Sequence, residues 1–147
     1  MRVSVVSEDV KERRRAASAL LLHAGAEVIE VASAAELRDR IIAKGERFDV
    51  LVVDGDLQPR GGFATLYDLR ARAELEGTEP IAAIVLISRE QDVWLAGWAG
   101  ANGVVMKPVH PFDLAKRVSA LEHAPAAPYG DAGSDAAQLA VAVRDHR

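Results

Sequence analysis

The sequence predicts one α/β domain in which a five-stranded parallel sheet has helices on both faces. Between Arg2 and Ala124, five short runs rich in β-branched residues alternate with longer segments of helical period, the pattern of a parallel sheet wrapped by helices. Three of these five runs are unbroken apolar stretches, as strands buried on both faces require. Half of the 147 residues are apolar, so the chain can build one sizeable core.

The first strand is predicted at Val3–Val6. A helix should follow, because apolar residues then recur at helical spacing. Gly25 lies where a left-handed C-terminal cap of this helix belongs, and the second strand is predicted just after it, at Val28–Val31. The predicted buried stripe of the first helix is Ala17, Leu20, Leu21 and Ala24.

The second helix begins with a capping-box pattern, in which Ser33 is followed three residues later by Glu36. Leu37 and Ile41 are four residues apart and therefore share one face of a helix. The helix should end near Gly45, ahead of the third strand.

The rest of the domain continues this alternation. The last helix begins at Pro111, a residue favoured in the first helical turn. Its predicted buried face is Leu114, Ala115, Val118 and Leu121. The remaining predicted strands are Val50–Val53, Ile81–Ile87 and Val104–Met106, and the helices between them run from Phe63 to Ala73 and from Gln91 to Ala99.

The domain is expected to span residues 1–123. After Glu122 the composition shifts to alanine, proline, glycine and aspartate, which is typical of a linker. We therefore expect residues 124–147 to form a flexible C-terminal tail, and we assign it no function.

The charge and composition exclude several classes of protein. The net charge of -4 and the pI near 5.6 give no basic field, so we expect no direct contact with nucleic acid. There is no cysteine, which excludes disulfides and thiolate zinc sites but leaves carboxylate metal sites open. No apolar run reaches the roughly 18 residues of a membrane span. We expect a cytoplasmic protein without a membrane partner.

Residues able to do chemistry stand at the carboxyl ends of four predicted strands. These ends share one edge of a parallel sheet, where open α/β sheets bind their ligands. The first strand leads into Ser7, Glu8 and Asp9, the third into Asp54, Gly55 and Asp56, the fourth into Ser88, and the fifth into Lys107 and Pro108. Acids, a hydroxyl and a lysine should therefore meet at a single edge.

Such a set suits phosphoryl transfer to a carboxylate, because the protein then mainly positions groups and neutralises the charge on the transferred oxygens. We expect Asp54 to be the nucleophile. Lys107 would pair with Asp54 or with a phosphoryl oxygen, and the Ser88 hydroxyl would donate a hydrogen bond to the attached phosphoryl group.

The acids also predict a Mg²⁺ site, because a hard divalent cation prefers oxygen ligands and keeps several waters. The expected ligands are Glu8 and Asp54, with Asp9 and Asp56 as further candidates. An acid after a strand can also be a helix cap or a turn former, and this second interpretation stays open for Asp9 and Asp56.

Several short motifs along the chain together match one family pattern: Ser7-Glu8-Asp9, the run from Phe48 to Asp54, Pro59, Gly62, Ser88, Gly100-Ala101 and Met106-Lys107-Pro108. With these motifs, residues 2–122 resemble the receiver domain of two-component response regulators. The resemblance implies a flavodoxin-like (βα)5 fold with strand order 2-1-3-4-5, and a switch in the face formed by the fourth helix, fifth strand and fifth helix. It also implies a cis peptide bond between Lys107 and Pro108.

The resemblance implies that a histidine kinase or phosphotransfer protein phosphorylates Asp54 in a Mg²⁺-dependent reaction. The only catalysis implied is self-catalysed phosphorylation and hydrolysis, so no enzyme activity beyond that is expected. No output domain follows in the sequence. We therefore expect a stand-alone receiver that signals to an unknown downstream protein.

Three positions depart from the family pattern. Ser7 stands where the family usually has its first acid, and Pro59 follows Asp54 by five residues instead of four. Val104 stands where the family often has a tyrosine or phenylalanine that swings inward on activation. These departures favour an alternative, a pseudo-receiver that binds partners without phosphorylation. A more remote alternative is a haloacid-dehalogenase-like phosphatase, which Asp54-Gly55-Asp56 after a strand also resembles.

Trp94 and Trp98 are four residues apart on the predicted fourth helix, so they share one face. Burial is the first interpretation of such a pair. The second is a partner or homodimer surface formed by Trp94, Trp98 and Val104, because aromatic residues are enriched at interfaces.

Overall fold

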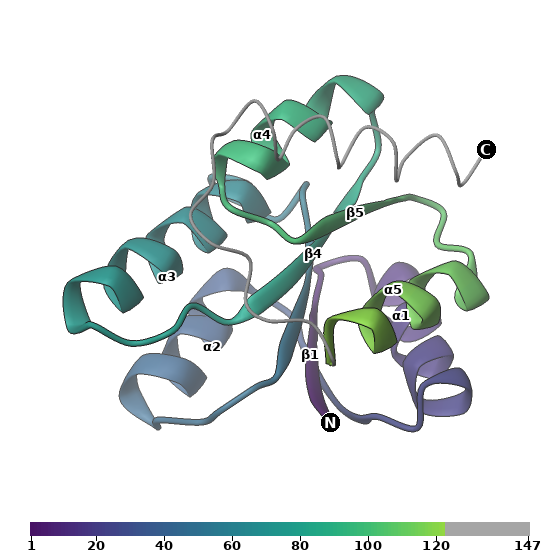
Figure 1. The fold of residues 1–147 in the computed structure, drawn as a ribbon. Coiled ribbons are helices and arrows are strands. Elements are labelled where there is room, and N and C mark those ends of the chain that lie inside the picture. Colours follow the sequence, from purple (N-terminus) through teal and green to yellow (C-terminus); the bar gives the residue numbers. More distant parts are fainter. Residues whose placement is uncertain (123–147) are drawn as a thin grey trace.

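A computed structural model describes residues 1–122 and contains one parallel sheet in the order β2-β1-β3-β4-β5 (Figure 1). This confirms the predicted fold class and strand order. The strands are β1 (Arg2–Val6), β2 (Glu27–Val31), β3 (Val50–Asp54), β4 (Ala82–Ile87) and β5 (Gly103–Met106). The helices are α1 (Val10–His23), α2 (Ala34–Arg38), α3 (Gly62–Glu76), α4 (Val93–Trp98) and α5 (Pro111–Glu122), with a π-helix η1 (Asp39–Ala43) and a 3-10 turn η2 (Glu90–Asp92).

The proposed tail at residues 124–147 lies outside the described residues, so the domain boundary at residue 123 stays a prediction. Within residues 1–122, no helix is long and apolar enough to cross a membrane.

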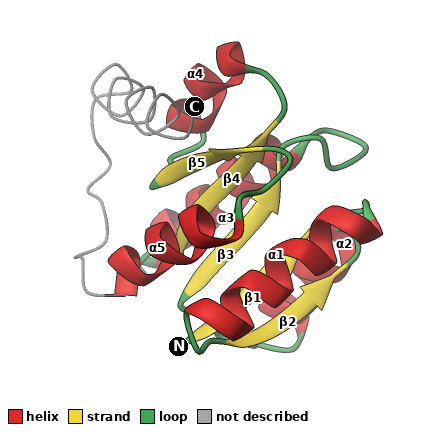
Figure 2. Ribbon diagram, turned by 90° about the vertical axis from the view of Figure 1, so that its right-hand side faces the viewer, coloured by secondary structure: helices red, strands yellow, loops and turns green. Residues whose placement is uncertain are grey.

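Helices cover both faces of the sheet. α1 and α5 lie together on one face, and α2, α3 and α4 lie on the other (Figures 1 and 2). The core accordingly has two apolar layers, because successive side chains of a strand point to opposite faces. In β3, Val53 packs in the layer of Leu37, and Val52 packs in the layer of Leu20 and Leu114. Burial of each of these leucines stabilises the fold by roughly 1.5–3 kcal/mol.

The C-terminal cap of α1 is confirmed, because Gly25 follows the cap residue with a φ of +61°. The predicted stripe is wrong at one position, since Leu21 is 61% exposed whereas Leu20 is fully buried. Neighbouring helical residues lie about 100° apart, so a narrow buried face takes only one of two adjacent leucines. The buried residues of α1 are Ala16, Ala17, Ala19 and Leu20.

The predicted N-cap of α2 at Ser33 is confirmed, and the reciprocal bond of Glu36 goes to Ala32, one residue before this N-cap. The Ser33 hydroxyl oxygen accepts from the Glu36 N–H at 3.1 Å, and the Glu36 carboxylate accepts from the Ala32 N–H at 2.9 Å. After Arg38 the helix widens into η1, in which the Lys44 N–H donates to the Asp39 carbonyl. The helical segment ends just before Gly45, as predicted.

α3 and α4 depart from the predicted bounds at their ends. α3 continues to Glu76, past the predicted Ala73, and ends at Gly77 with a left-handed φ of +70°. α4 is short, because its first turn is the 3-10 segment η2. α5 begins at Pro111 as predicted.

The strand register aligns the polar edge of the sheet. Val6 pairs with Val53, so the next residues along β1 and β3, Ser7 and Asp54, are neighbours. Asp54 pairs with Leu86, which brings Asp56 level with Ser88 when both segments are counted onward. Ile87 pairs with Met106 and places Ser88 beside Lys107 in the same way.

Candidate functional site

Asp54 is the last residue of β3 and is only 3% exposed. The Lys107 ammonium donates to Asp54 Oδ1 at 2.7 Å, and the Ser7 hydroxyl donates to Asp54 Oδ2 at 2.6 Å. The Asp56 N–H also donates to Asp54 Oδ1, at 3.0 Å. Both oxygens of this buried carboxylate are therefore hydrogen-bonded, as a buried charge requires.

Lys107 follows β5 and bridges two carboxylates. Its ammonium lies 2.7 Å from Asp54 Oδ1 and 2.8 Å from Asp56 Oδ2. Burial acts against its charge, but the hydrogen bonds to Asp54 and Asp56 outweigh that effect and raise the pKa of Lys107 above its usual value. The peptide bond between Lys107 and Pro108 is cis, as the resemblance implies. A second cis bond, between Gln58 and Pro59, lies in the loop after β3.

Ser88 lies at the end of β4, and its hydroxyl donates to Asp56 Oδ2 at 2.7 Å. Asp56 differs from Asp54 in exposure, since its side chain is 55% exposed and that of Asp54 only 5%. Hydrogen bonds from Lys107 and Ser88 lower the pKa of Asp56. The carboxylate of Asp56 therefore stays ionised. It accepts hydrogen bonds from both Ser88 and Lys107 on the solvent side of Asp54.

The two acids that follow β1 have separate roles. Glu8 is exposed, and its carboxylate accepts a hydrogen bond from the backbone N–H of Gln58 in the loop after β3. The Asp9 carboxylate is the N-cap of α1 and accepts from the N–H groups of Lys11 and Glu12. For Asp9 the contacts match the helix-cap interpretation, and the predicted role as a metal ligand gains no support from them.

The donor set suits magnesium in its chemistry. Within residues 1–122, no three acidic or histidine side chains lie close enough together to form a metal cluster. Mg²⁺ does not need such a cluster, because it keeps several waters and is usually held by one or two carboxylates. The carboxylates that would hold it are those of Asp54, at the end of β3, and of Glu8, in the loop after β1.

Ser7 has a role that the sequence reasoning missed. The sequence gives Ser7 no specific role in the chemistry, yet its fully buried hydroxyl donates to Asp54 and accepts from the Asp9 N–H at 3.1 Å. The signal was present in the sequence, because Ser7 follows the first strand as Asp54 follows the third. In parallel neighbouring strands those two positions are adjacent.

Gly62 and Gly55 hold the loop after β3 close to the sheet. A Cβ at Gly62 would lie 2.2 Å from the carbonyl oxygen of Asp54, and one at Gly55 would lie 2.9 Å from the Phe63 ring. The N-terminus of α3 therefore packs directly against the backbone of Asp54, where only glycine leaves the room.

A model of the response regulator receiver domain matches residues 3–119. The chain belongs to this family. The receiver is 34% identical to an uncharacterized response regulatory protein of Mycobacterium tuberculosis, over 86% of this chain and 94% of that protein.

Solved structures share the fold of the receiver. The BeF3-activated DrrB receiver domain aligns with a TM-score of 0.69 at 21% identity, over 84% of this chain and 97% of that chain. The chemotaxis response regulator CheY4 of Vibrio cholerae aligns with a TM-score of 0.68 at 23% identity, over 82% of this chain and 97% of that chain.

The residues predicted for a partner surface separate into exposed and buried positions. Trp94 and Trp98 of the receiver are 60% and 43% exposed, so burial, the first interpretation of this pair, is wrong. The Trp98 ring stacks on Tyr67 of α3 with centroids 4.4 Å apart. Val104 is fully buried in β5 beneath α3 and α4, and it therefore cannot form part of an exposed surface as predicted.

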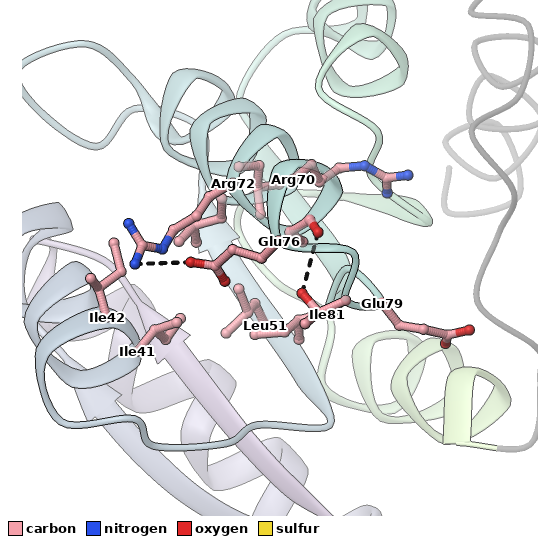
Figure 3. A pocket seen from close by; sticks show the side chains of 12 residues that line it. Ile41, Ile42, Leu51, Arg70, Arg72, Glu76, Glu79 and Ile81 are labelled. Atoms are coloured by element: carbon pink, nitrogen blue, oxygen red, sulfur yellow. Dashed lines mark hydrogen bonds and ion pairs between the residues drawn. The ribbon is translucent and has the colours of Figure 1, made fainter.

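The receiver also has a hollow of about 320 Å³ among η1, β3 and α3 (Figure 3). Leu51 and Ile81 line its apolar part, and Arg72 and Glu76 form an ion pair of 3.0 Å beside it (Figure 3). The hollow contains none of the predicted site residues, so it has no part in the chemistry at Asp54.

Proposed function

We propose that the chain accepts a phosphoryl group on Asp54 in a Mg²⁺-dependent reaction and signals through contacts with other proteins. The observation that carries the proposal is the Lys107 ammonium, 2.7 Å from a carboxylate buried at the end of the central strand. Membership of the receiver family supports it, because such domains act in two-component signalling. The partners would be a histidine kinase or phosphotransfer protein and a downstream protein.

In the proposed step, an Asp54 oxygen forms a bond to phosphorus while the bond from phosphorus to the donor atom breaks. The electron pair leaves with the donor, a histidine nitrogen of the kinase or the acetate of acetyl phosphate. Lys107 would neutralise charge on the transferred oxygens, and Ser88 would donate a hydrogen bond to one of them. Mg²⁺, which Asp54 and Glu8 would hold, would supply further positive charge for this step.

The pseudo-receiver alternative rests on two specific observations. The Ser7 hydroxyl donates a hydrogen bond to Asp54 Oδ2, and the Asp54 side chain is only 5% exposed. Both reduce the access of a phosphoryl donor to this carboxylate. Membership of the receiver family argues against the phosphatase alternative. Action as a stand-alone protein stays a prediction.

The test is the intact mass of the protein after incubation with acetyl phosphate and Mg²⁺. We expect one added phosphoryl group on the wild type, and none on Asp54→Asn or on wild type with a chelator. The Asp54→Asn substitution keeps the shape of the side chain but removes the nucleophilic carboxylate. A wild type that stays unmodified and binds no Mg²⁺ would leave the pseudo-receiver as the better explanation.

A further inference from the structure

We propose that the Asp56 carboxylate occupies the place of a phosphoryl oxygen in the unmodified protein and competes with the incoming phosphoryl group for Ser88 and Lys107. The inference rests on the proposed function, because it uses the roles given there to these two donors. It adds a residue that opposes the reaction from within the site.

One oxygen atom of Asp56 contacts both donors. Asp56 Oδ2 accepts from the Ser88 hydroxyl at 2.7 Å and from the Lys107 ammonium at 2.8 Å. A phosphoryl group on Asp54 would need the same two donors, and its oxygens are anionic acceptors like those of a carboxylate. In the unmodified protein, Asp56 therefore makes the two contacts that a phosphoryl group on Asp54 would need.

The Ser88 hydroxyl cannot donate to Asp56 and to a phosphoryl group on Asp54 at the same time. A serine hydroxyl has one proton to donate, and in this structure that proton points to Asp56. Lys107 has three N–H donors, of which two are directed to Asp54 and Asp56. Formation of the phosphorylated site therefore requires Asp56 to release Ser88 and to share or release Lys107.

The position of Asp56 strengthens the competition. Its backbone N–H donates to Asp54 Oδ1, which holds the start of the loop against the acceptor carboxylate. Its side chain is far more exposed than that of Asp54. An anionic phosphoryl donor thus meets the negative Asp56 side chain before it reaches Asp54, and the two repel each other. The same exposure gives the side chain room to move away.

Asp56→Asn tests the inference. Asparagine keeps the shape and one acceptor oxygen but loses the charge that holds Lys107 and repels the donor. We expect its rate of modification by acetyl phosphate at fixed Mg²⁺ to rise roughly tenfold, as the loss of a charge-assisted hydrogen bond predicts, and Asp56→Ala to be modified at least as fast. The matched control is Asp39→Asn, which removes a charge that pairs with Lys44 on the surface of η1 and should leave the rate unchanged.

A second readout needs neither metal nor phosphoryl donor. Coupling constants in the NMR spectrum report the side-chain rotamer of Ser88 in the unmodified protein. One rotamer is expected in the wild type, where Asp56 holds the hydroxyl, and averaging between rotamers is expected in Asp56→Ala. Averaging already in the wild type would overturn the inference.

The outcomes separate this inference from the proposed function. If the wild type is modified on Asp54 and Asp56→Asn is no faster, only the competition is refuted. A slower Asp56→Asn that needs more Mg²⁺ would instead identify Asp56 as a metal ligand and also refute it. If neither protein is modified, both proposals fail. Modification of Asp56→Asn alone would support the competition and would count against phosphoryl acceptance by the wild-type protein.

Discussion

At the scale of single residues, the site depends on which group donates to which oxygen. Asp54 Oδ2 has the Ser7 hydroxyl as its donor, in a place where both side chains are almost fully buried. The receiver family usually has an acid at this position, and a second carboxylate would repel Asp54 in the absence of a cation. The serine instead stabilises the Asp54 carboxylate without a metal.

Replacement of Ser7 by alanine should destabilise the protein by about 1–3 kcal/mol, because it leaves one buried carboxylate oxygen of Asp54 without its donor. The measurement is urea denaturation at neutral pH. The matched control is Ser4→Ala, since Ser4 is also fully buried in β1 but its hydroxyl has no hydrogen-bond partner among the described residues. Equal losses in the two variants would show that the contact of Ser7 with Asp54 contributes nothing.

At the scale of elements, the start of α3 is fixed by its contact with the end of β3. The backbone of Gly62 packs on the Asp54 carbonyl, and the Gly62 N–H donates to the Gly55 carbonyl at 3.1 Å. Helix and strand therefore approach each other closely through the Asp54 backbone, with the Val53 side chain beside it. This approach positions the loop that contains Asp56.

A methyl group at Gly62 has no room, so Gly62→Ala should destabilise the protein by about 1–3 kcal/mol, the usual cost of overpacking. It should also displace the loop after β3, which amide chemical shifts of Asp56 and Gln58 would report. Gly103→Ala in β5 is the control, because a Cβ there would find its nearest neighbour at an ordinary 3.8 Å. A Gly62→Ala variant as stable as Gly103→Ala would contradict the predicted clash.

At the scale of the whole molecule, distant segments are joined at the amino edge of the sheet by ion pairs around Glu46. Its carboxylate lies 3.0 Å from Arg2 of β1 and 3.1 Å from Arg40 of η1. The hydrogen bond from Arg2 is the main cause that lowers the pKa of Glu46 below its ordinary 4.5, and Arg40 adds to the effect.

A carboxylate whose pKa is lower in the folded than in the unfolded protein stabilises the fold above its ordinary pKa and loses this effect as the pH falls through its folded value. Glu46→Gln should therefore lower the midpoint of thermal unfolding at pH 7. The difference from wild type should shrink steadily below pH 4.5. A difference that persists unchanged in acid would mean that the ion pairs are not its source.

Local chemistry in the sequence determined much of this protein. Unbroken apolar runs specify strands buried on both faces, and the capping box at Ser33 and the glycine at position 25 specify helix ends, because these signals act within a few residues. The placement of Asp54 and Lys107 at the same edge of the sheet followed from the same pattern, since parallel strands of one sheet end at a common edge.

Only the tertiary structure decided which groups meet across the chain. The sequence offered Asp56 as a metal ligand or a turn former, and the structure places its carboxylate on Ser88 and Lys107. It also exposes Trp94 and buries Val104. Such outcomes depend on strand register and on the packing of helices against the sheet. These set distances of a few ångströms between residues far apart in the chain, which no local pattern encodes.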